Sequence, residues 1–227
     1  MSPNTFNVLP KYKNKQEIAY DEIKNAIITC RFQPGDQLVI RTLAAQLGIS
    51  EIPVREALKR LISENYVTEN GSALTVSAIS ADDFVDMLEV KLDLEMIAIK
   101  VAARNITDEQ IEYLKSILKS MEECYHDNNL KEYRKEHSRF HLECALTCDV
   151  PYLMTAISSS FGHHERAINY FNLSSWEQQP SLQDHSDIMN ALMNHDPEAA
   201  QKYLHENRER AYNLYRKQMA EIISKQQ

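Results

Sequence analysis

The sequence contains little glycine, only four residues in 227. Glycine supplies the positive backbone angles that tight turns require, so this scarcity argues against a many-stranded sandwich. Long helices with short connections are favoured instead. An apolar content of 43% is enough for a substantial core in a chain of this length. The predicted fold class is therefore mostly α.

Long apolar runs are also missing, since none approaches the roughly 20 residues that cross a bilayer. The first residues, MSPNTFNVLPKYKNKQ, contain no apolar core of a signal peptide. We therefore expect a cytoplasmic protein with no membrane partner. Four cysteines lie within helical patterns, which indicates reduced thiols rather than a disulfide framework: Cys30, Cys124, Cys144 and Cys148.

The net charge of −8 is unevenly distributed along the chain. Residues 1–77 carry nine basic and eight acidic side chains, whereas residues 78–227 carry sixteen basic and twenty-five acidic ones. Such asymmetry indicates different roles for the two parts. We predict two domains, at residues 1–77 and 78–227.

The first domain begins with an amphipathic helix pattern over residues 16–32, and the punctuating pair Pro34-Gly35 follows. A short helix over residues 41–47 leads into a glycine turn. A second helix then starts, with Ser50 as its N-cap. Two short helices joined by such a turn predict a helix-turn-helix.

After these helices the apolar period changes from helical to strand-like. Residues 66–69 and 73–77 are rich in β-forming residues and flank Asn70-Gly71, a favoured type I′ hairpin turn. Helix, helix-turn-helix and hairpin in this order predict a winged helix, with its second short helix in a DNA major groove. A small helical domain without a nucleic-acid role is the alternative for a bare helix-turn-helix.

The segments PGDQL, LAAQLGIS and PVREAL, at these separations, resemble the winged helix of the GntR family of bacterial transcription regulators. The resemblance implies a set of DNA-contacting residues: Arg41, Ser50, Arg55 and, at the wing tip, Gly71. Arg55 would hold a phosphate or a guanine edge. Many relatives have arginine where this chain has Glu51. This carboxylate either accepts from cytosine N4, which changes the operator, or only supports its helix terminus.

The second domain shows helical apolar spacing throughout. One helix starts near Ser80, and Lys91 fills a gap in its apolar stripe. Thr107 opens a capping box, and Pro151 and Pro197 stand where first helical turns accept proline. Further helices are predicted over residues 108–125, 130–147, 151–170, 179–194 and 197–224. The result is an antiparallel six-helix bundle.

The stretch KEHSRFHLECALTC, residues 135–148, places two histidines and two cysteines at helical spacing. His137 and His141 share a helix face, as do Cys144 and Cys148. All four cannot bind one ion, because the helix rises about 16 Å from His137 to Cys148. The cysteines are expected in the core, and a metal here needs ligands from elsewhere in the chain.

Three further features resemble the effector-binding FCD domain that follows the winged helix in the FadR subgroup: VKLDLE at residues 90–95, the pair Phe140-His141, and His185 three residues before Ile188. Many FCD domains bind a divalent metal through one aspartate and three histidines. By position, this resemblance makes His141 and His185 ligands. His137 replaces the aspartate.

The last ligand position of the family falls on Asn207, with His205 as a nearby alternative. An imidazole-rich set suits zinc, with nickel as the other candidate. Lys91 stands where the family commonly has an arginine facing the effector, and Arg139 is a second candidate for binding it. We expect the effector to be a small carboxylate.

Together these features predict a metabolite-responsive transcription regulator rather than an enzyme. It would bind pseudo-palindromic, double-stranded operator DNA as a homodimer. Two alternatives remain open. One is a helical metal-dependent hydrolase that uses zinc-bound water, and the other is a DNA-binding protein whose bundle only dimerises.

Overall fold

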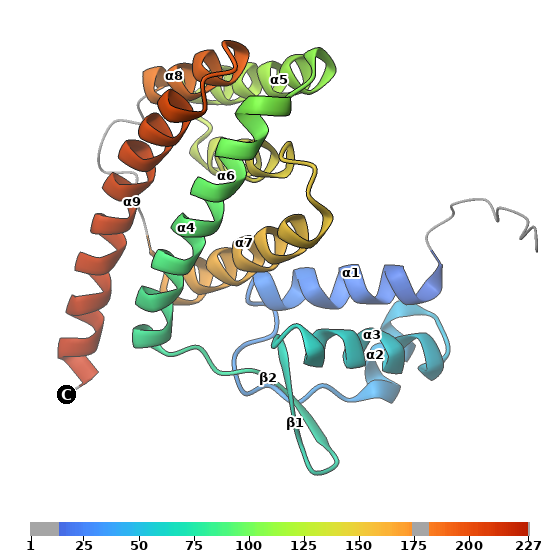
Figure 1. The fold of residues 1–227 in the computed structure, drawn as a ribbon. Coiled ribbons are helices and arrows are strands. Elements are labelled where there is room, and N and C mark those ends of the chain that lie inside the picture. The colour runs from blue at the N-terminus through green and yellow to red at the C-terminus, as the bar shows by residue number, and fades with distance from the viewer. Residues whose placement is uncertain (1–13, 174–181, 227) are drawn as a thin grey trace, which may run out of the picture. The chain divides into compact units, whose positions relative to one another are not determined.

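The computed structural model describes residues 14–173 and 182–226 (Figure 1). The chain separates into two compact units, Met1–Ala78 and Ile79–Gln227. The first unit is a small helical domain with a hairpin, and the second is entirely helical in its described residues. The prediction of a mostly α fold with an N-terminal winged helix-turn-helix is confirmed.

From residue 14 onward, the first unit contains three helices and one hairpin: α1 (Lys15–Ile28), α2 (Ile40–Leu47), α3 (Glu51–Ser63), β1 (Val67–Asn70) and β2 (Ala73–Val76). Gly48 ends α2 in the left-handed conformation at φ 65°, which turns the chain toward α3. The inward face of α3 is the predicted one, with Val54, Ala57, Leu58 and Leu61 buried. These side chains pack against α1 and the hairpin.

Two local predictions in this unit are wrong. The helix expected over residues 16–32 ends at Ile28, because Thr29 caps it and Cys30 adopts a φ of 55°. The hairpin register pairs Asn70 with Ala73, so Gly71 and Ser72 form the loop. Of these two, only Gly71 has a positive φ, which is typical of a type II′ rather than a type I′ turn.

The second unit contains six helices within its described residues: α4 (Ala81–Asn105), α5 (Asp108–His126), α6 (Leu130–Leu146), α7 (Pro151–Phe171), α8 (Leu182–Met193) and α9 (Pro197–Gln226). The start expected at residue 179 lies outside the described residues. Ser80 caps α4, and the Thr107 capping box is present at α5. Sequence therefore located most helix starts correctly.

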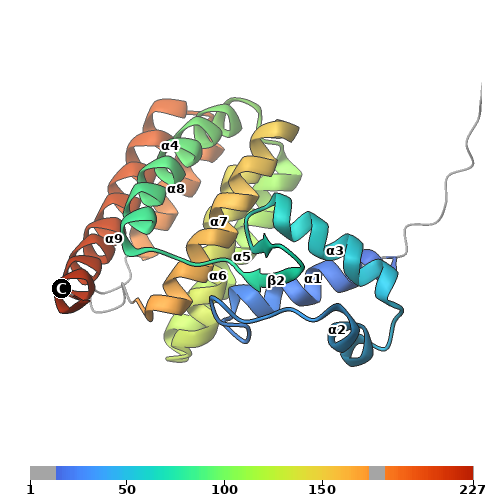
Figure 2. The same ribbon diagram turned by 90° about the horizontal axis from the view of Figure 1, so that it is seen from below.

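The long helix α4 lies beside α9, as both views show (Figures 1 and 2), and also packs against α6 and α7. A large apolar core joins α4, α5, α6, α7, α8 and α9, and a second one joins α4, α7 and α9. Cys144 and Cys148 are buried in the larger core as free thiols, as predicted. Within the described ranges, no helix is long and apolar enough to cross a membrane.

Candidate functional site

Three histidines meet inside the second unit. His137 and His141 lie one turn apart on α6, and His185 approaches them from α8. One ligand nitrogen from each ring can be chosen so that all three lie within 4.8 Å of one another. His141 Nε2 lies 3.2 Å from His185 Nε2, and both side chains are buried. The structure thus brings together the three histidines proposed from sequence.

These histidines fit a metal ion in spacing and chemistry. Two nitrogens bound to one tetrahedral zinc ion stand about 3.3 Å apart, close to the observed separation of His141 and His185. His141 Nδ1 is buried and has no hydrogen-bond partner among the described residues. Burial lowers the pKa of His137 and His141 well below the usual value, helped by the charges of His185 and Arg208. Neutral imidazole is the form that binds metals.

A buried charged cluster lies in the same unit and consists of Lys91, Glu95, Arg208 and Tyr212. Arg208 on α9 donates two hydrogen bonds to Glu95 Oε1, from Nη2 at 2.8 Å and from Nε at 3.1 Å. Lys91 Nζ donates to Glu95 Oε2 at 2.8 Å, and the Tyr212 hydroxyl donates to the same oxygen at 3.1 Å. All four side chains are buried.

This cluster has two basic groups and one acidic group. Burial and the Arg208 charge lower the pKa of Lys91 to about 7, although Glu95 opposes the shift. The ammonium also lies over the Phe161 ring, 3.4 Å from its centroid, which is a cation–π contact. With Lys91 protonated, the cluster carries one surplus positive charge. Such a surplus favours the binding of an anion beside the cluster.

The two residues predicted to bind an effector differ in position. Lys91 is fully buried, so its place in the apolar stripe of α4 was interpreted correctly. Arg139 is exposed and donates to Glu136 and to the Tyr113 hydroxyl, each at 3.1 Å. It stands two residues from both His137 and His141 on α6, so it points to the other side of the helix. The structure does not bring Arg139 to the three histidines or to the cluster around Glu95.

Sequence reasoning missed Glu95, Arg208 and Tyr212. A signal for Arg208 was present, because Leu204, Arg208 and Tyr212 recur every four residues and therefore share the inward face of α9. A charged residue within an apolar stripe indicates a buried charge that needs a partner. Its partner, Glu95, lies 113 residues away, and only the fold reveals the pair.

Asn207 and His205 are the two candidates for the last metal ligand. Asn207 is half-buried on α9, next to Arg208, whereas His205 is exposed and lies outside the histidine group.

His164 on α7 is buried, and its Nε2 has no hydrogen-bond partner among the described residues. Its ring packs against Phe84 and Tyr212. His164 is thus a further buried polar group beside the charged cluster.

The residues predicted to contact DNA lie on exposed parts of the first unit. Arg41 is exposed in the first turn of α2, and Ser50 is the N-cap residue of α3, although its side chain makes no capping hydrogen bond. Arg55 and Glu51 are exposed on α3, with Arg55 Nη2 3.9 Å from Glu51 Oε2. Gly71 stands at the hairpin tip with a φ of 63°.

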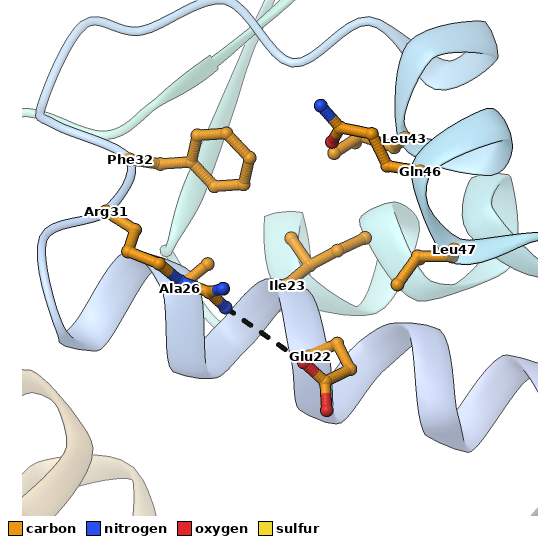
Figure 3. A pocket seen from close by; sticks show the side chains of 8 residues that line it. All are labelled: Glu22, Ile23, Ala26, Arg31, Phe32, Leu43, Gln46 and Leu47. Atoms are coloured by element: carbon orange, nitrogen blue, oxygen red, sulfur yellow. Dashed lines mark ion pairs between the residues drawn. The ribbon is translucent and has the colours of Figure 1, made fainter.

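A cavity of about 560 Å³ lies between α1 and α2 in the first unit (Figure 3). Apolar side chains from both helices line it together with Glu22, Arg31 and Gln46, and Glu22 and Arg31 form an exposed ion pair at 4.0 Å on one side. Among the described residues around it, no charged or polar side chain is buried. The cavity therefore lacks the inward-facing polar groups that recognise a small polar ligand.

Both parts of the chain match known families. Residues 15–76 match the gntR family of bacterial regulatory proteins, and residues 86–209 match the FCD domain. The HTH-type transcriptional regulator McbR of Escherichia coli K12 is 23% identical over 189 residues, which cover 82% of this chain and 86% of McbR. The HTH-type transcriptional repressor NanR of Klebsiella aerogenes is 26% identical over 220 residues, covering 85% of this chain and 82% of NanR.

The fold is similar to a solved structure of E. coli McbR/YncC, with a TM-score of 0.75 at 22% identity. The match covers 90% of this chain and 98% of that one. These relatives are transcription regulators, which rejects the hydrolase alternative. The protein is a DNA-binding transcription regulator of the metabolite-responsive class, and its chain belongs to the gntR family, with an FCD domain after the winged helix.

Proposed function

We propose that this regulator binds a divalent metal, zinc in preference to nickel, through His137, His141 and His185. The convergence of these three side chains is the observation that carries the proposal. Asn207 is the proposed fourth ligand. Zinc suits three imidazoles better than magnesium or calcium does, because those ions prefer oxygen ligands. The order of winged helix and FCD domain also leads us to place the protein in the FadR subgroup.

The effector is a small carboxylate in this proposal. When bound, the metal supplies a positive charge that attracts a carboxylate. Lys91 and Arg208 add a second source of positive charge, and Arg208 is close enough to lower the pKa of His141. A bound anion would also favour the protonated form of Lys91. Arg139 has no part in this proposal, because it lies at the surface.

Operator binding by two copies of the chain is the second element of the proposal. A dimer presents two recognition helices to the two half-sites of a pseudo-palindrome. An effector regulates the dimer if it binds one arrangement of the recognition helices more tightly than another. Because a bacterial operator lies in the cytoplasm, we also place the protein there.

An exposed face of α4 supports pairing between two copies. Val90 and Ile97 are 58% and 54% exposed, which is unusual for large apolar side chains on a packed helix. Leu94 and Val101 are half-buried beside them. At 100° per residue these four side chains lie within about 60° of one another around α4. They form one apolar stripe.

The charges that flank this stripe are self-complementary. The N-terminal half of α4 exposes Asp86, Glu89 and Asp93, and the C-terminal half exposes Lys100 and Arg104. Within the described part of the chain, none of the five makes an ion pair. An antiparallel two-fold pair of α4 helices therefore puts the acidic half of one copy against the basic half of the other.

Metal analysis tests the histidine site. We expect the purified native protein to contain bound zinc or nickel, and His141→Ala and His185→Ala to lose it. His205→Ala is the matched control, because His205 is an exposed histidine outside the group, and it should keep the metal. Circular dichroism of each variant checks folding. Unchanged metal content in both test variants would refute the site.

A thermal-shift series tests the effector class. Adding small mono- and dicarboxylates to the metal-loaded protein should raise Tm for at least one acid, because a ligand of the folded state stabilises it. Lys91→Met should weaken that response, whereas Lys119→Met, an exposed lysine on α5, should not. A response unchanged by Lys91→Met, or an equal response from matched alcohols, contradicts the carboxylate proposal.

Charge reversal tests the dimer face. Lys100→Glu/Arg104→Glu and Asp86→Lys/Asp93→Lys should each weaken self-association at least tenfold in sedimentation experiments, and an equal mixture should restore a dimer. Lys115→Glu/Lys119→Glu on α5 is the control pair and should associate like the unchanged protein. If each reversed variant dimerises normally alone, the copies pair through another surface.

A further inference from the structure

Ile52 is an exposed isoleucine on α3, the proposed recognition helix. It is the second residue of α3 and is 74% exposed. Two other large apolar side chains are exposed in the described part of this unit, Ile18 at 44% and Val39 at 46%. Both are less exposed than Ile52. The side chain therefore gains little from packing within its own unit.

The neighbours of Ile52 on α3 are charged and also exposed. Glu51 precedes it, and Arg55 stands three residues later, where side chains are neighbours on a helix surface. The N-terminal residues of a recognition helix are the ones that reach base edges in the major groove. Ile52 thus extends the DNA-contacting surface formed by Glu51 and Arg55.

The chemistry of isoleucine restricts what it can contact there. It has no hydrogen-bond donor or acceptor, so it cannot read the polar groups of a base edge. The C5-methyl group of thymine is the apolar group that base edges present in the major groove. Contact between the two would remove the exposed side chain and the methyl group from water together.

We propose that Ile52 selects thymine in each operator half-site by packing against its C5-methyl group. The selected thymine neighbours the base contacted by Arg55 or Glu51. This inference rests on the proposed placement of α3 in the major groove. It assigns operator specificity to a residue outside the set implied by the family resemblance.

Deoxyuridine substitution tests the contact, because deoxyuridine differs from thymidine only by the missing methyl group. The probe is a duplex selected by the full-length protein from a random-sequence pool. Each thymine is replaced singly, and affinity is measured by fluorescence anisotropy. We expect one thymine per half-site where replacement weakens binding about three- to fivefold, the value of one buried methyl group. Ile52→Ala should bind the thymine duplex and the deoxyuridine duplex equally.

Two variants separate the possible failures. Ile18→Ala removes another exposed isoleucine, on α1, and should keep the full deoxyuridine effect. If Arg55→Ala weakens binding but no thymine position is sensitive in the unchanged protein, the Ile52 contact is wrong while α3 remains the recognition helix. If Arg55→Ala binds the duplex normally, the placement of α3 fails as well. Equal deoxyuridine sensitivity in Ile52→Ala also overturns the contact.

Discussion

The two units place their candidate functional groups in opposite environments. In the first unit, Arg41, Glu51 and Arg55 are exposed on helices that bury only apolar faces. In the second unit, Lys91, Glu95 and Arg208 are buried together with two of the histidines. The groups proposed to contact DNA thus stand in water, whereas the groups proposed to bind a metal or a small ligand stand inside the core.

This difference decides how function and stability are linked. Exposed charges are hydrated before binding, and their pairs contribute little to folding. Buried charges have lost their hydration and depend on one another, so removing one partner leaves an uncompensated charge. Substitutions of the exposed charges Arg41, Glu51 and Arg55 should therefore change DNA binding selectively. Substitutions in the buried cluster should change stability as well.

The largest effect is expected from Glu95→Gln. It removes the carboxylate that accepts from Lys91, Arg208 and Tyr212, so two buried basic groups lose their counter-charge. We expect a loss of about 3–5 kcal/mol in the free energy of unfolding, measured in urea by circular dichroism. Glu123 on α5 lies 3.8 Å from Lys119 in an exposed ion pair. Glu123→Gln should lower the free energy of unfolding by less than about 1 kcal/mol. Equal losses would remove the contrast between buried and exposed charges.

Arg55→Ala should have the next largest effect, on DNA binding rather than on folding. Loss of a base contact weakens operator affinity by about 1–3 kcal/mol, and loss of a phosphate contact lowers the salt slope by about one. Anisotropy titrations of a labelled operator at several salt concentrations distinguish these outcomes. Lys119→Ala is the control with unchanged affinity. If Arg55→Ala lowered the free energy of unfolding by several kcal/mol, the proposed separation of DNA binding from stability would be contradicted.

Gly71→Ala should have a smaller effect. A Cβ at this position meets nothing within 4 Å, so any loss comes from the φ of 63°. The strain of an L residue there is about 1–2 kcal/mol, which should lower the stability of the first unit and misplace the wing. Ser72→Ala, at the neighbouring loop position without a positive φ, should change the unfolding curve far less. Matching curves for the two variants would exclude a conformational role for Gly71.

The smallest effect concerns the response of the first unit to acid. Burial would raise the pKa of Glu64, but hydrogen bonds from Lys24 and Tyr20 outweigh it and lower the pKa overall. A carboxyl with a lower pKa in the folded state stabilises it above the unfolded pKa, and this stabilisation disappears as pH falls through the folded pKa. Glu64→Gln should therefore flatten the acid-side decline in Tm below about pH 5. An unchanged decline in Tm would show that Glu64 and its partners do not contribute to acid sensitivity.

Local sequence signals predicted much of the fold. Ser80 and Thr107 start helices as expected, because a capping side chain satisfies backbone donors only three residues away. The inward face of α3 followed from apolar spacing alone. The end of α1 was missed because Cys30 adopts a left-handed conformation that its residue type does not favour. The direction of Arg139 could not be read from spacing within α6, because its partner Tyr113 stands on another helix.

The sequence by itself determined the helical class, the two-part organisation and the pair His137 and His141, since these depend on composition and on residues close along the chain. The family resemblance added His185 to that pair, and the tertiary structure brings its ring to within hydrogen-bond distance of His141. Only the tertiary structure decided that Arg208 neutralises Glu95. Contacts across such separations depend on how α6 packs near α8 and how α9 lies beside α4. Packing joins all the apolar faces at once, so no local pattern specifies which buried polar groups become partners.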